Sequence, residues 1–305
     1  MMDAELIRSA QALEGAKVLL NEPLSRHTSL GVGGPADLFV VPDSTIALSA
    51  VVNYAVDARV PFFVLGEGTN VIVRDGGIRG MAIKLGRNLA AISREGGLVT
   101  AQAGVRLAML CRKCCEWGVS GLEFAAGIPG SLGGALVMNA GAYDGEMGQI
   151  VDWVLAIDRE GHQRRLSRDE LDMEYRHSSF QHNDMIVAEA GLSLRPEDPK
   201  VVRNRTYTVV EDRCCKQPIT QRSAGSIFMR PQGDYAGRLL EEAGAKGLQV
   251  GKAKISEKHA NFIVNSNGAT AAEILELIEL ARQRVHDRFD IWLQPEVMVV
   301  GEDPE

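Results

Sequence analysis

The placement of glycine constrains this chain more than any other sequence feature. Glycine accounts for 32 of the 305 residues, and many glycines fall in two segments, VLGEGTNVIV (64–73) and AAGIPGSLGGALVMNAGAYDG (125–145). Glycine adopts backbone conformations that other residues avoid and lets the backbone approach a partner closely. Because backbone N–H groups in such loops can surround an anion, the two segments predict a ligand with two ends, such as a dinucleotide.

Each segment also has a plainer interpretation. Gly66-Glu67-Gly68 begins like the fingerprint of doubly wound nucleotide-binding folds, but Val71 stands at the third glycine position and a strand follows in place of a helix. An ordinary glycine turn therefore remains the alternative for the first segment. A buried glycine-rich connection remains the alternative for the second, although Pro129-Gly130 is a turn signal.

Length and charge narrow the class of protein. A chain of 305 residues predicts two domains with a core that needs no disulfide or metal. The net charge of -7 argues against a general nucleic-acid partner, and we infer no protein partner. No apolar stretch approaches the length of a membrane span, and no secretory signal is apparent. Together with an odd number of cysteines, five, these features predict a cytoplasmic protein with reduced thiols.

Hydrophobic periodicity predicts a mixture of helices and strands. A helix is expected over residues 3–19, and strands over 37–42 and 60–65 flank a second helix capped by Ser44. This strand–helix–strand order is typical of parallel pairing, and another strand, 71–75, follows the first glycine segment.

Later parts of the chain give three further local predictions. A hairpin is expected to turn at Glu160-Gly161, and Thr270 with Glu273 forms a capping-box pattern at the start of a long helix. The charged stretch 195–218 is the expected domain boundary.

Motifs of several enzyme classes are missing. The sequence has no GxxxxGK[ST] phosphate loop, no HExxH zinc motif and no GxSxG nucleophile elbow. Cys111 and Cys114 form a CxxC, but late in a helical pattern where a thiolate gains no stabilisation. Cys214-Cys215 lack the spacing of a tetrahedral zinc site. We therefore predict free thiols, buried or half-buried, and no metal.

Five segments, in chain order, carry a resemblance to a known family. They are VLGEGTNVIV, AAGIPGSLGGALVMNAGA, SAGSIFMRP, KHANFIVN and LQPEVMVVG, and the match runs from about Ser25 to Gly301. Together they resemble the UDP-N-acetylenolpyruvoylglucosamine reductase family, flavoenzymes that form UDP-N-acetylmuramate for bacterial peptidoglycan. The resemblance implies an α+β fold with a two-lobed FAD-binding domain of the vanillyl-alcohol-oxidase (PCMH) type and a smaller α+β substrate-binding domain. The implied boundaries are 1–85 and 86–205 for the two lobes and 206–305 for the substrate domain.

The resemblance also implies the cofactors. FAD would be bound noncovalently, with its diphosphate on the first glycine loop and the second segment wrapped around it, and NADPH would be the reductant. Neither glycine segment contains a histidine to which flavin could be attached. The residues that match the flavin-binding role are Gly66, Glu67, Gly68, Thr69, Asn70, Gly127, Ile128, Pro129, Gly130, Ser131, Gly134, Asn139, Gly141 and Ala142.

The family's reaction implies three catalytic residues. Hydride passes from the reduced flavin to the methylene carbon of the enolpyruvyl group, and Ser226 matches the serine that protonates the neighbouring carbon. Arg176 matches the active-site arginine, whose planar fork can hold a carboxylate. Glu296 matches the catalytic glutamate. The residues that fall where the family contacts the sugar nucleotide are Lys216, Arg230 and His259.

The chain departs from some members of the family at two places. Many relatives carry asparagine where this chain has Arg230. Some members carry a tyrosine-bearing insertion that closes over the substrate, and the short spacing from Phe180 to Met185 leaves no room for it. The chain therefore resembles the subclass that lacks this insertion.

Two other functions stay open at the level of sequence. A flavin-dependent oxidase of the same superfamily would often hold its flavin covalently, so that acid precipitation would not release it. A noncatalytic sugar-nucleotide-binding protein would be colourless, or yellow with a flavin that NADPH does not bleach.

Overall fold

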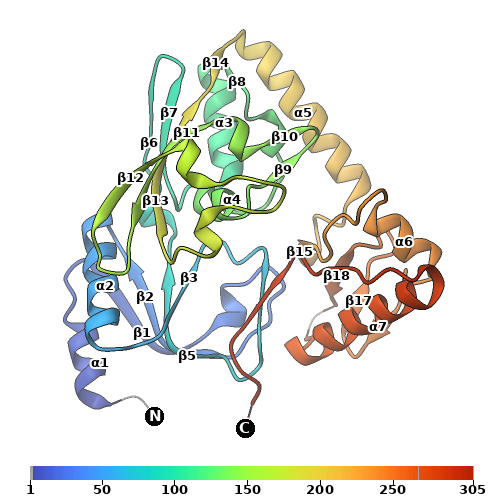
Figure 1. Ribbon diagram of the computed structural model, residues 1–305, viewed down its shortest axis with the longest axis horizontal. Helices are drawn as coiled ribbons and strands as arrows, with labels where there is room; N and C mark the ends of the chain where they lie inside the picture. Colours follow the sequence, from blue (N-terminus) through green and yellow to red (C-terminus); the bar gives the residue numbers. More distant parts are fainter. Residues whose placement is uncertain (1–2, 267, 305) are drawn as a thin grey trace. The chain divides into compact units, whose positions relative to one another are not determined.

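The computed structural model describes residues 3–266 and 268–304 (Figure 1). Contacts divide the chain into two compact units, which are described separately below. Unit 1 consists of Met1–Leu20, Asp37–Glu67 and Gly80–Asp212, and unit 2 of Asn21–Ala36, Gly68–Arg79 and Arg213–Glu305. The chain thus changes unit within the first glycine loop and again inside the stretch 195–218. The division at 85/86 and 205/206 into two lobes and a substrate domain stays a prediction.

A four-stranded sheet with two helices opens the chain, and its beginning corrects one prediction. The prediction of one helix over 3–19 is wrong. Helix α1 (Ala4–Gln11) ends early, and Gly15, at a φ of +71°, leads into a strand. Glycine takes this left-handed conformation without strain. Ser44 caps α2 (Thr45–Asp57) as predicted, its Oγ accepting the Ala47 N–H at 3.1 Å. The strand order is β1 (Ala16–Pro23), β2 (Pro35–Pro42), β5 (Ile78–Lys84) and β3 (Phe62–Leu65).

Parallel pairing occurs, but not between the strands on either side of α2. Strand β3 pairs in parallel with β5, which separates it from β2. In unit 2, β4 (Val71–Val73) pairs in parallel with β19 (Met298–Val300). The first glycine loop therefore connects strands that belong to two different sheets.

The second sheet of unit 1 is antiparallel throughout. Its strand order is β12 (Gln163–Ser167), β11 (Val151–Ile157), β13 (Ile186–Ser193), β7 (Leu98–Gln102) and β6 (Ile92–Glu95). The predicted hairpin at Glu160-Gly161 is confirmed by the pairing of β11 with β12, and Gly161 has a φ of +72°. At this exposed turn the ligand atoms of Asp158, Glu160 and His162 lie within 4.8 Å of one another. Exposed acidic groups commonly cluster in this way without a metal ion.

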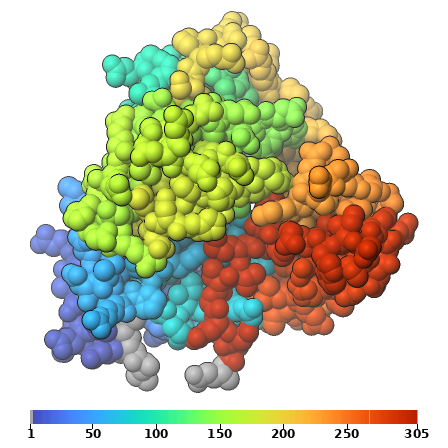
Figure 2. Space-filling view, viewed as in Figure 1, coloured from blue at the N-terminus to red at the C-terminus, as the bar shows by residue number. Residues whose placement is uncertain are grey.

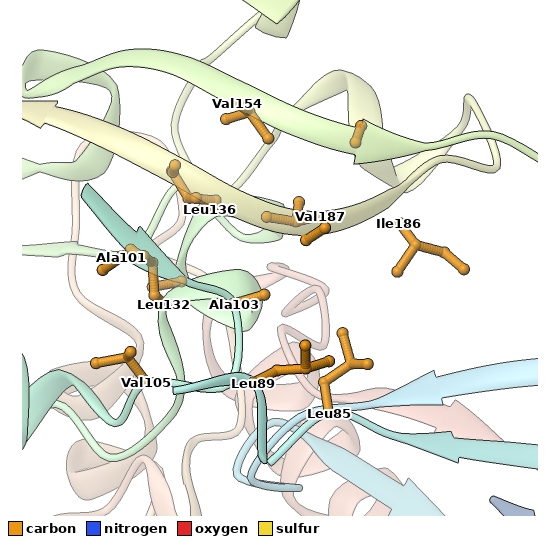
Figure 3. Close-up of a cluster of buried hydrophobic side chains, with 14 of the residues drawn as sticks. Leu85, Leu89, Ala101, Ala103, Val105, Leu132, Leu136, Val154, Ile186 and Val187 are labelled. Carbon is orange, nitrogen blue, oxygen red and sulfur yellow. The ribbon is translucent and has the colours of Figure 1, made fainter. Parts of the chain in front are cut away.

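Helix α4 (Leu132–Val137) packs the second glycine segment against this sheet. Leu132 and Leu136 are fully buried, and Figure 3 shows them among apolar side chains of the sheet and its neighbouring loops. Each leucine contributes about 1.5–3 kcal/mol by burial. A Cβ on Gly133 would lie 2.9 Å from the Ala103 Cβ, so a glycine in the first turn lets the helix approach this closely. The labelled neighbours are Leu85, Leu89, Ala101, Ala103, Val105, Val154, Ile186 and Val187.

Unit 1 also contains helix α3, several short strands and several 3-10 helices, which are labelled η. Helix α3 covers Leu107–Trp117, and the pair β9–β10 forms a tight hairpin directly after α4. The short elements are η2 (Arg87–Leu89), β8 (Val119–Ser120), η3 (Glu123–Ala125), β9 (Gly141–Ala142), β10 (Gly145–Glu146), η4 (Met147–Gln149), η5 (Arg168–Leu171), η6 (Ser179–Gln181) and β14 (Arg195–Pro196).

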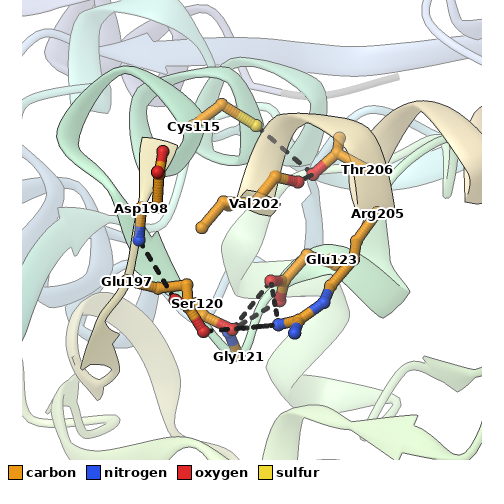
Figure 4. A network of polar contacts seen from close by, with 9 residues as sticks. All are labelled: Cys115, Ser120, Gly121, Glu123, Glu197, Asp198, Val202, Arg205 and Thr206. Atoms are coloured by element: carbon orange, nitrogen blue, oxygen red, sulfur yellow. Dashed lines mark hydrogen bonds and ion pairs between the residues drawn. The ribbon is translucent and has the colours of Figure 1, made fainter. Parts of the chain in front are cut away.

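Helix α5 (Pro199–Lys216) is fixed in unit 1 by a polar network (Figure 4). Glu123 accepts hydrogen bonds from the Ser120 hydroxyl (2.8 Å) and the Gly121 N–H (2.6 Å), and it lies 4.0 Å from the Arg205 guanidinium. Cys115 Sγ contacts Thr206 Oγ1 at 3.3 Å, so this thiol packs against the helix.

The five cysteines are free thiols, as predicted, but they differ in burial. Cys111, Cys114 and Cys115 are buried, whereas Cys214 and Cys215 are exposed, contrary to the expectation of burial. Burial raises the pKa of the Cys114 thiol to about 12, so this member of the CxxC is protonated near neutral pH.

Unit 2 contains a small antiparallel sheet and the longest helix. The sheet has the order β15 (Arg222–Ser226), β18 (Phe262–Asn265), β17 (Ala253–Ile255) and β16 (Gln249–Val250). The predicted capping box of Thr270 and Glu273 is confirmed at the start of α7, and Asp75 accepts the Ala271 N–H at 2.9 Å. The remaining elements are η1 (Leu24–Arg26), α6 (Ala236–Glu242) and α7 (Ala271–Phe289). Within 3–266 and 268–304, no helix is both long and apolar enough to cross a bilayer.

Gly191 on β13 gives a direct test of the packing in the second sheet. A Cβ there would lie 2.1 Å from Nε1 of Trp153, a buried side chain on the paired strand. We expect Gly191→Ala to lower the free energy of unfolding by about 1–3 kcal/mol, measured by denaturant titration. Ser193→Ala, at an exposed position on the same strand, is the control and should change it by less than about 0.5 kcal/mol. Equal stability of both variants would contradict this packing.

Candidate active site

The first glycine loop contacts the second glycine segment inside unit 1. A Cβ at Gly66 would lie 2.7 Å from the Oγ of Ser131, closer than real Cβ atoms approach. Ser131 has little freedom to move, because it is 2% exposed and its Oγ caps α4 by accepting the Gly134 N–H. A Cβ at position 66 would therefore displace the Ser131 hydroxyl from its cap on α4, which gives a packing reason for glycine here beyond an ordinary turn.

Charged side chains surround the beginning of this loop. The Arg106 Nε lies 2.7 Å from the Glu67 carboxylate, and the Lys84 Nζ donates to the Gly66 carbonyl. Burial lowers the pKa of Lys84, while the carboxylate of Glu67 acts in the opposite direction. Two cations and one carboxylate leave this end of the loop positive, which suits an anionic group such as a diphosphate.

Sequence reasoning did not single out these two cations. Lys84 is the last residue of β5, and Arg106 immediately precedes α3. In the sequence, the only indication of a role is that one lies at the end of a predicted strand and the other at the start of a predicted helix. Neither place shows from the sequence alone that the side chain reaches the glycine loop.

The second half of the loop belongs to unit 2. Gly68 has a φ of +65°, and a Cβ there would lie 2.2 Å from the His27 carbonyl oxygen. The Gly68 carbonyl accepts the Ser29 N–H at 2.9 Å. Half-buried Thr69 follows, and Asn70 donates through Nδ2 to the Glu296 carbonyl at 3.2 Å. The loop is therefore fixed on this side as well, and it contacts the segment that carries the predicted glutamate.

The second glycine segment exposes part of its backbone. Gly127 and Gly130 have φ values of +76° and +144°, which place both in conformations that favour glycine. Gly127, Pro129 and Gly134 are exposed, and Ile128 and Gly130 are half-buried. Bare, exposed backbone of this kind can lie against a flat ring or a phosphate chain. The structure thus offers a surface for a ligand where the resemblance implies FAD.

Arg176 lies in a tight turn of unit 1 beside the end of this segment. The Arg176 Nη2 donates to the Gly141 carbonyl at 3.3 Å, and the guanidinium lies 5.0 Å from the ring centre of Tyr175. Gly141 and Ala142 are half-buried in β9. Figure 2 shows the green to yellow-green part of unit 1 on the molecular surface. The arginine is thus placed next to the predicted flavin segment and near solvent.

Asn139, another residue predicted to bind the cofactor, is fully buried between the glycine segment and this turn. Its Nδ2 donates to the Glu174 carbonyl and its Oδ1 accepts the Gly148 N–H, both at 2.8 Å. Both ends of its amide therefore have protein partners.

Ser226 and Glu296 are neighbours through their backbones in unit 2. The Glu296 N–H donates to the carbonyl of Ile227, the residue after the serine, at 2.7 Å. The pairing of β15 with β18 shifts between Ser223 and Ser226, and Gly225 has a φ of +74° with open space where its Cβ would be. Such a bulge redirects the side chain that follows it. Half-buried Ser226 is thus presented at an irregularity beside the segment of Glu296.

Asn261 fixes the chain after the serine. It is 7% exposed, and its side chain accepts the Phe228 N–H and donates to the Phe228 carbonyl, both at 2.9 Å. The Asn261 carbonyl also accepts the Ile227 N–H at 2.9 Å. Sequence reasoning did not single out this residue, although it lies within the KHANFIVN segment.

The three residues predicted to contact the sugar nucleotide have different environments in unit 2. The ring of half-buried His259 meets the ring of Phe262 edge-on, with centroids 4.9 Å apart, and its Nδ1 accepts the Asn261 N–H at 3.2 Å. Arg230 is exposed and lies 4.0 Å above the ring of Tyr235. Lys216 is exposed at the end of α5.

The predicted residues thus form one group in each unit. The glycine contact and Arg176 belong to unit 1, and Ser226, Glu296 and Asn70 to unit 2. The cations of the unit 1 group, Arg176 with Lys84 and Arg106 beside the first glycine loop, suit an anionic ligand.

Comparisons with known proteins point to one family. Residues 36–167 match the family described as "FAD binding domain", and residues 217–300 match "UDP-N-acetylenolpyruvoylglucosamine reductase, C-terminal domain". The UDP-N-acetylenolpyruvoylglucosamine reductase of Syntrophomonas wolfei is 45% identical over 94% of this chain and 96% of its own length. The enzyme of that name from Clostridium tetani is 44% identical over 95% of this chain and 94% of its own.

Comparison with solved structures indicates the same family. The crystal structure of UDP-N-acetylenolpyruvylglucosamine reductase from Thermus caldophilus matches with a TM-score of 0.81 and 34% identity. The match covers 94% of this chain and 99% of that one. These similarities confirm the resemblance found in the sequence and the predicted α+β fold with its FAD-binding domain.

The environment of His259 predicts its titration. Burial, with a smaller contribution from Lys246, lowers the pKa of the imidazole below its usual 6.5. The unfolded chain then binds a proton at a higher pH than the folded chain. The contribution of His259 to stability is therefore complete above the unfolded pKa, and it decreases as the pH falls below that value.

The measurement is an NMR titration of the imidazole signals. Lys246→Gln should move the His259 midpoint upward, because it removes a nearby cation and leaves Glu241, 2.7 Å from the Lys246 Nζ, without that partner. A midpoint at or above 6.5 in the unmodified protein would contradict this account of the imidazole.

Proposed function

The chain belongs to the UDP-N-acetylenolpyruvoylglucosamine reductase family, and we propose that it reduces UDP-N-acetylglucosamine enolpyruvate to UDP-N-acetylmuramate with NADPH. It is an FAD-dependent oxidoreductase. The proposed product is a precursor of peptidoglycan, and the proposed compartment is the cytoplasm. The observation that supports this most directly is the close approach of Gly66 to Ser131, which brings the two glycine segments together within unit 1.

The residues proposed to bind the flavin offer positive charge and exposed backbone, both of which suit the cofactor. FAD bound at these residues would supply the redox chemistry, the transfer of a hydride from NADPH to the methylene carbon of the enolpyruvyl group. Lys84 and Arg106 provide positive charge beside the first loop for the diphosphate. The exposed backbone of Gly127 to Gly130 provides the surface along which the rest of the cofactor lies.

Arg176 would hold the substrate carboxylate. As hydride adds to the methylene carbon, negative charge develops at the neighbouring carbon and spreads into the carboxylate. A guanidinium can bind a carboxylate through two parallel hydrogen bonds and stabilise that charge. The proposed role uses the planar fork of the side chain, so a lysine, with a single ammonium group, would not replace it.

Ser226 would deliver the proton. Hydride addition to one carbon and transfer of the Ser226 hydroxyl proton to the other saturate the double bond, and the serine regains its proton from solvent. A hydroxyl is a weak acid, so the transfer depends on its position and on the high basicity of the carbon. The bulge at Gly225 and the backbone contact with the Glu296 segment supply that position. Glu296 would support the intermediate that forms before protonation.

The sugar nucleotide would be bound by Lys216, Arg230 and His259. Arg230 and Lys216 are exposed cations, and they suit the charge of a diphosphate. Burial lowers the pKa of His259, and its ring accepts a hydrogen bond from the Asn261 N–H and packs on Phe262, so it would act through hydrogen bonding and packing. The chain has no room for a tyrosine insertion between Phe180 and Met185, so closure over the substrate does not use one.

The proposal predicts a yellow protein whose flavin responds to two substrates in turn. NADPH should bleach the flavin absorbance, and the enolpyruvyl sugar nucleotide should restore it under anaerobic conditions. Acid precipitation should release the flavin, because it is held noncovalently. A flavin that stays reduced when the enolpyruvyl sugar nucleotide is added would overturn the proposed substrate.

Ser226→Ala separates the two halves of the reaction. Stopped-flow absorbance should show flavin reduction by NADPH within about threefold of the unmodified rate, since the serine acts only on the carbon acid. Reoxidation by the enolpyruvyl sugar nucleotide should fall by at least about 100-fold, as expected for loss of a positioned acid. Ser223→Ala, on the same strand, is the matched control. Normal turnover by Ser226→Ala would show that another group supplies the proton.

A further inference from the structure

The backbone of Arg176 is held in an unusual conformation. Its φ is +57°, in the left-handed region that residues with a Cβ avoid at a cost of about 1–2 kcal/mol. The turn is closed by hydrogen bonds between Glu174 and His177, at 3.2 and 3.0 Å. Such a conformation persists only when neighbouring groups fix it, and it is common at functional sites. The contacts around the turn show which groups do this.

Asn139 fixes the start of the turn. Its 2.8 Å hydrogen bonds to the Glu174 carbonyl and the Gly148 N–H tie the turn to the segment that follows α4. With 0% exposed surface, its side chain has no atom available to a ligand. Asn139 thus contributes to the site by shaping the turn, a different role from the cofactor contact implied by the resemblance.

Gln181 fixes the other side of the turn. Its Nε2 donates to the Arg176 carbonyl at 2.9 Å and to the Val137 carbonyl at 3.0 Å. The Ser178 hydroxyl donates to the same Val137 carbonyl at 2.7 Å. Val137 is the last residue of α4, where carbonyl groups lack partners within the helix. The arginine turn therefore caps the C-terminal end of α4, the helix within the second glycine segment.

We propose that Asn139 and Gln181 are positioning residues that hold the backbone of Arg176 in its left-handed conformation and aim its guanidinium at the substrate carboxylate. The proposal rests on the proposed function, since it takes the carboxylate as the partner of Arg176. Two parallel hydrogen bonds require the guanidinium to be oriented as well as near. A displacement of about 1 Å at such a site can lower the rate by about 100-fold. The same contacts connect the flavin segment to the arginine through one short helix.

The test is Gln181→Met, which keeps the length of the side chain and removes the donor to both carbonyls. We expect reoxidation of reduced flavin by the enolpyruvyl sugar nucleotide to slow by about 10-fold or more at saturating substrate. Flavin content and melting temperature should stay close to those of the unmodified protein. Ser179→Ala is the matched control, because the Ser179 hydroxyl donates to the Glu170 carbonyl, away from α4 and Arg176. It should change the reoxidation rate by less than about twofold.

A double-mutant cycle with Arg176→Lys separates positioning from general damage. Arg176→Lys alone should cause a severe loss, and adding Gln181→Met should lower the rate by less than about a further twofold, since its effect passes through the arginine. Independent, multiplying effects would overturn the proposal. A Gln181→Met variant with normal reoxidation would overturn it as well. So would one that loses flavin and both half-reactions in parallel.

Hydrogen–deuterium exchange gives a readout that does not depend on the substrate. Asn139 has a φ of +39°, which glycine tolerates, so Asn139→Gly is a suitable second variant. In Gln181→Met and in Asn139→Gly, amide exchange over residues 174–178 should be faster than in the unmodified protein and in Ser179→Ala. Unchanged exchange would overturn the proposed positioning of the Arg176 backbone by Asn139 and Gln181. If exchange rises but the unmodified protein does not use the enolpyruvyl sugar nucleotide, the proposed substrate is wrong, whereas the positioning of the Arg176 backbone by Asn139 and Gln181 is supported.

Discussion

The close approach of Gly66 to Ser131 is the constraint on which the flavin side of the site depends. A single added carbon would lie 2.7 Å from the serine oxygen, and that oxygen also caps the short helix α4. The helix in turn stays in place because Leu132 and Leu136 are fully buried against the second sheet of unit 1. One contact thus links the end of a strand, a cap and a hydrophobic core. Packing alone thus favours glycine at position 66, apart from any ligand.

Local charge explains how a chain with a net charge of -7 can bind anionic ligands. Lys84 and Arg106 lie beside the first glycine loop, and Arg176 lies beside the end of the second segment. The carboxylate of Glu67 accompanies the first two and keeps the burial of a lysine tolerable. The total charge is an average over the surface, whereas binding depends on the few groups near the ligand.

The sequence predicted features that depend on neighbours along the chain and missed those that depend on distant contacts. The hairpin at Glu160-Gly161 and the capping box at Thr270 are local, and both are confirmed. The helix expected over 3–19 was wrong, since Gly15 starts a strand whose partner lies elsewhere in the chain. The pairing of β4 with β19 and the approach of Lys84 to Gly66 arise from tertiary packing. A family motif could name Asn139 as a site residue, but only the structure shows that its amide nitrogen and oxygen both form hydrogen bonds inside the protein.

The groups proposed to act on the substrate share one structural property. Arg176 takes a left-handed backbone conformation, and Ser226 follows a bulge whose glycine does the same. In a regular strand or helix the backbone fixes the direction of each side chain. A side chain that must point in another direction therefore needs an irregular backbone. Irregular backbone loses some of its own hydrogen bonds, and side-chain amides replace them: buried Asn139 and half-buried Gln181 beside the arginine, and buried Asn261 beside the serine. The side-chain amides at these positions therefore support the backbone conformations from which Arg176 and Ser226 would act in the proposed reaction.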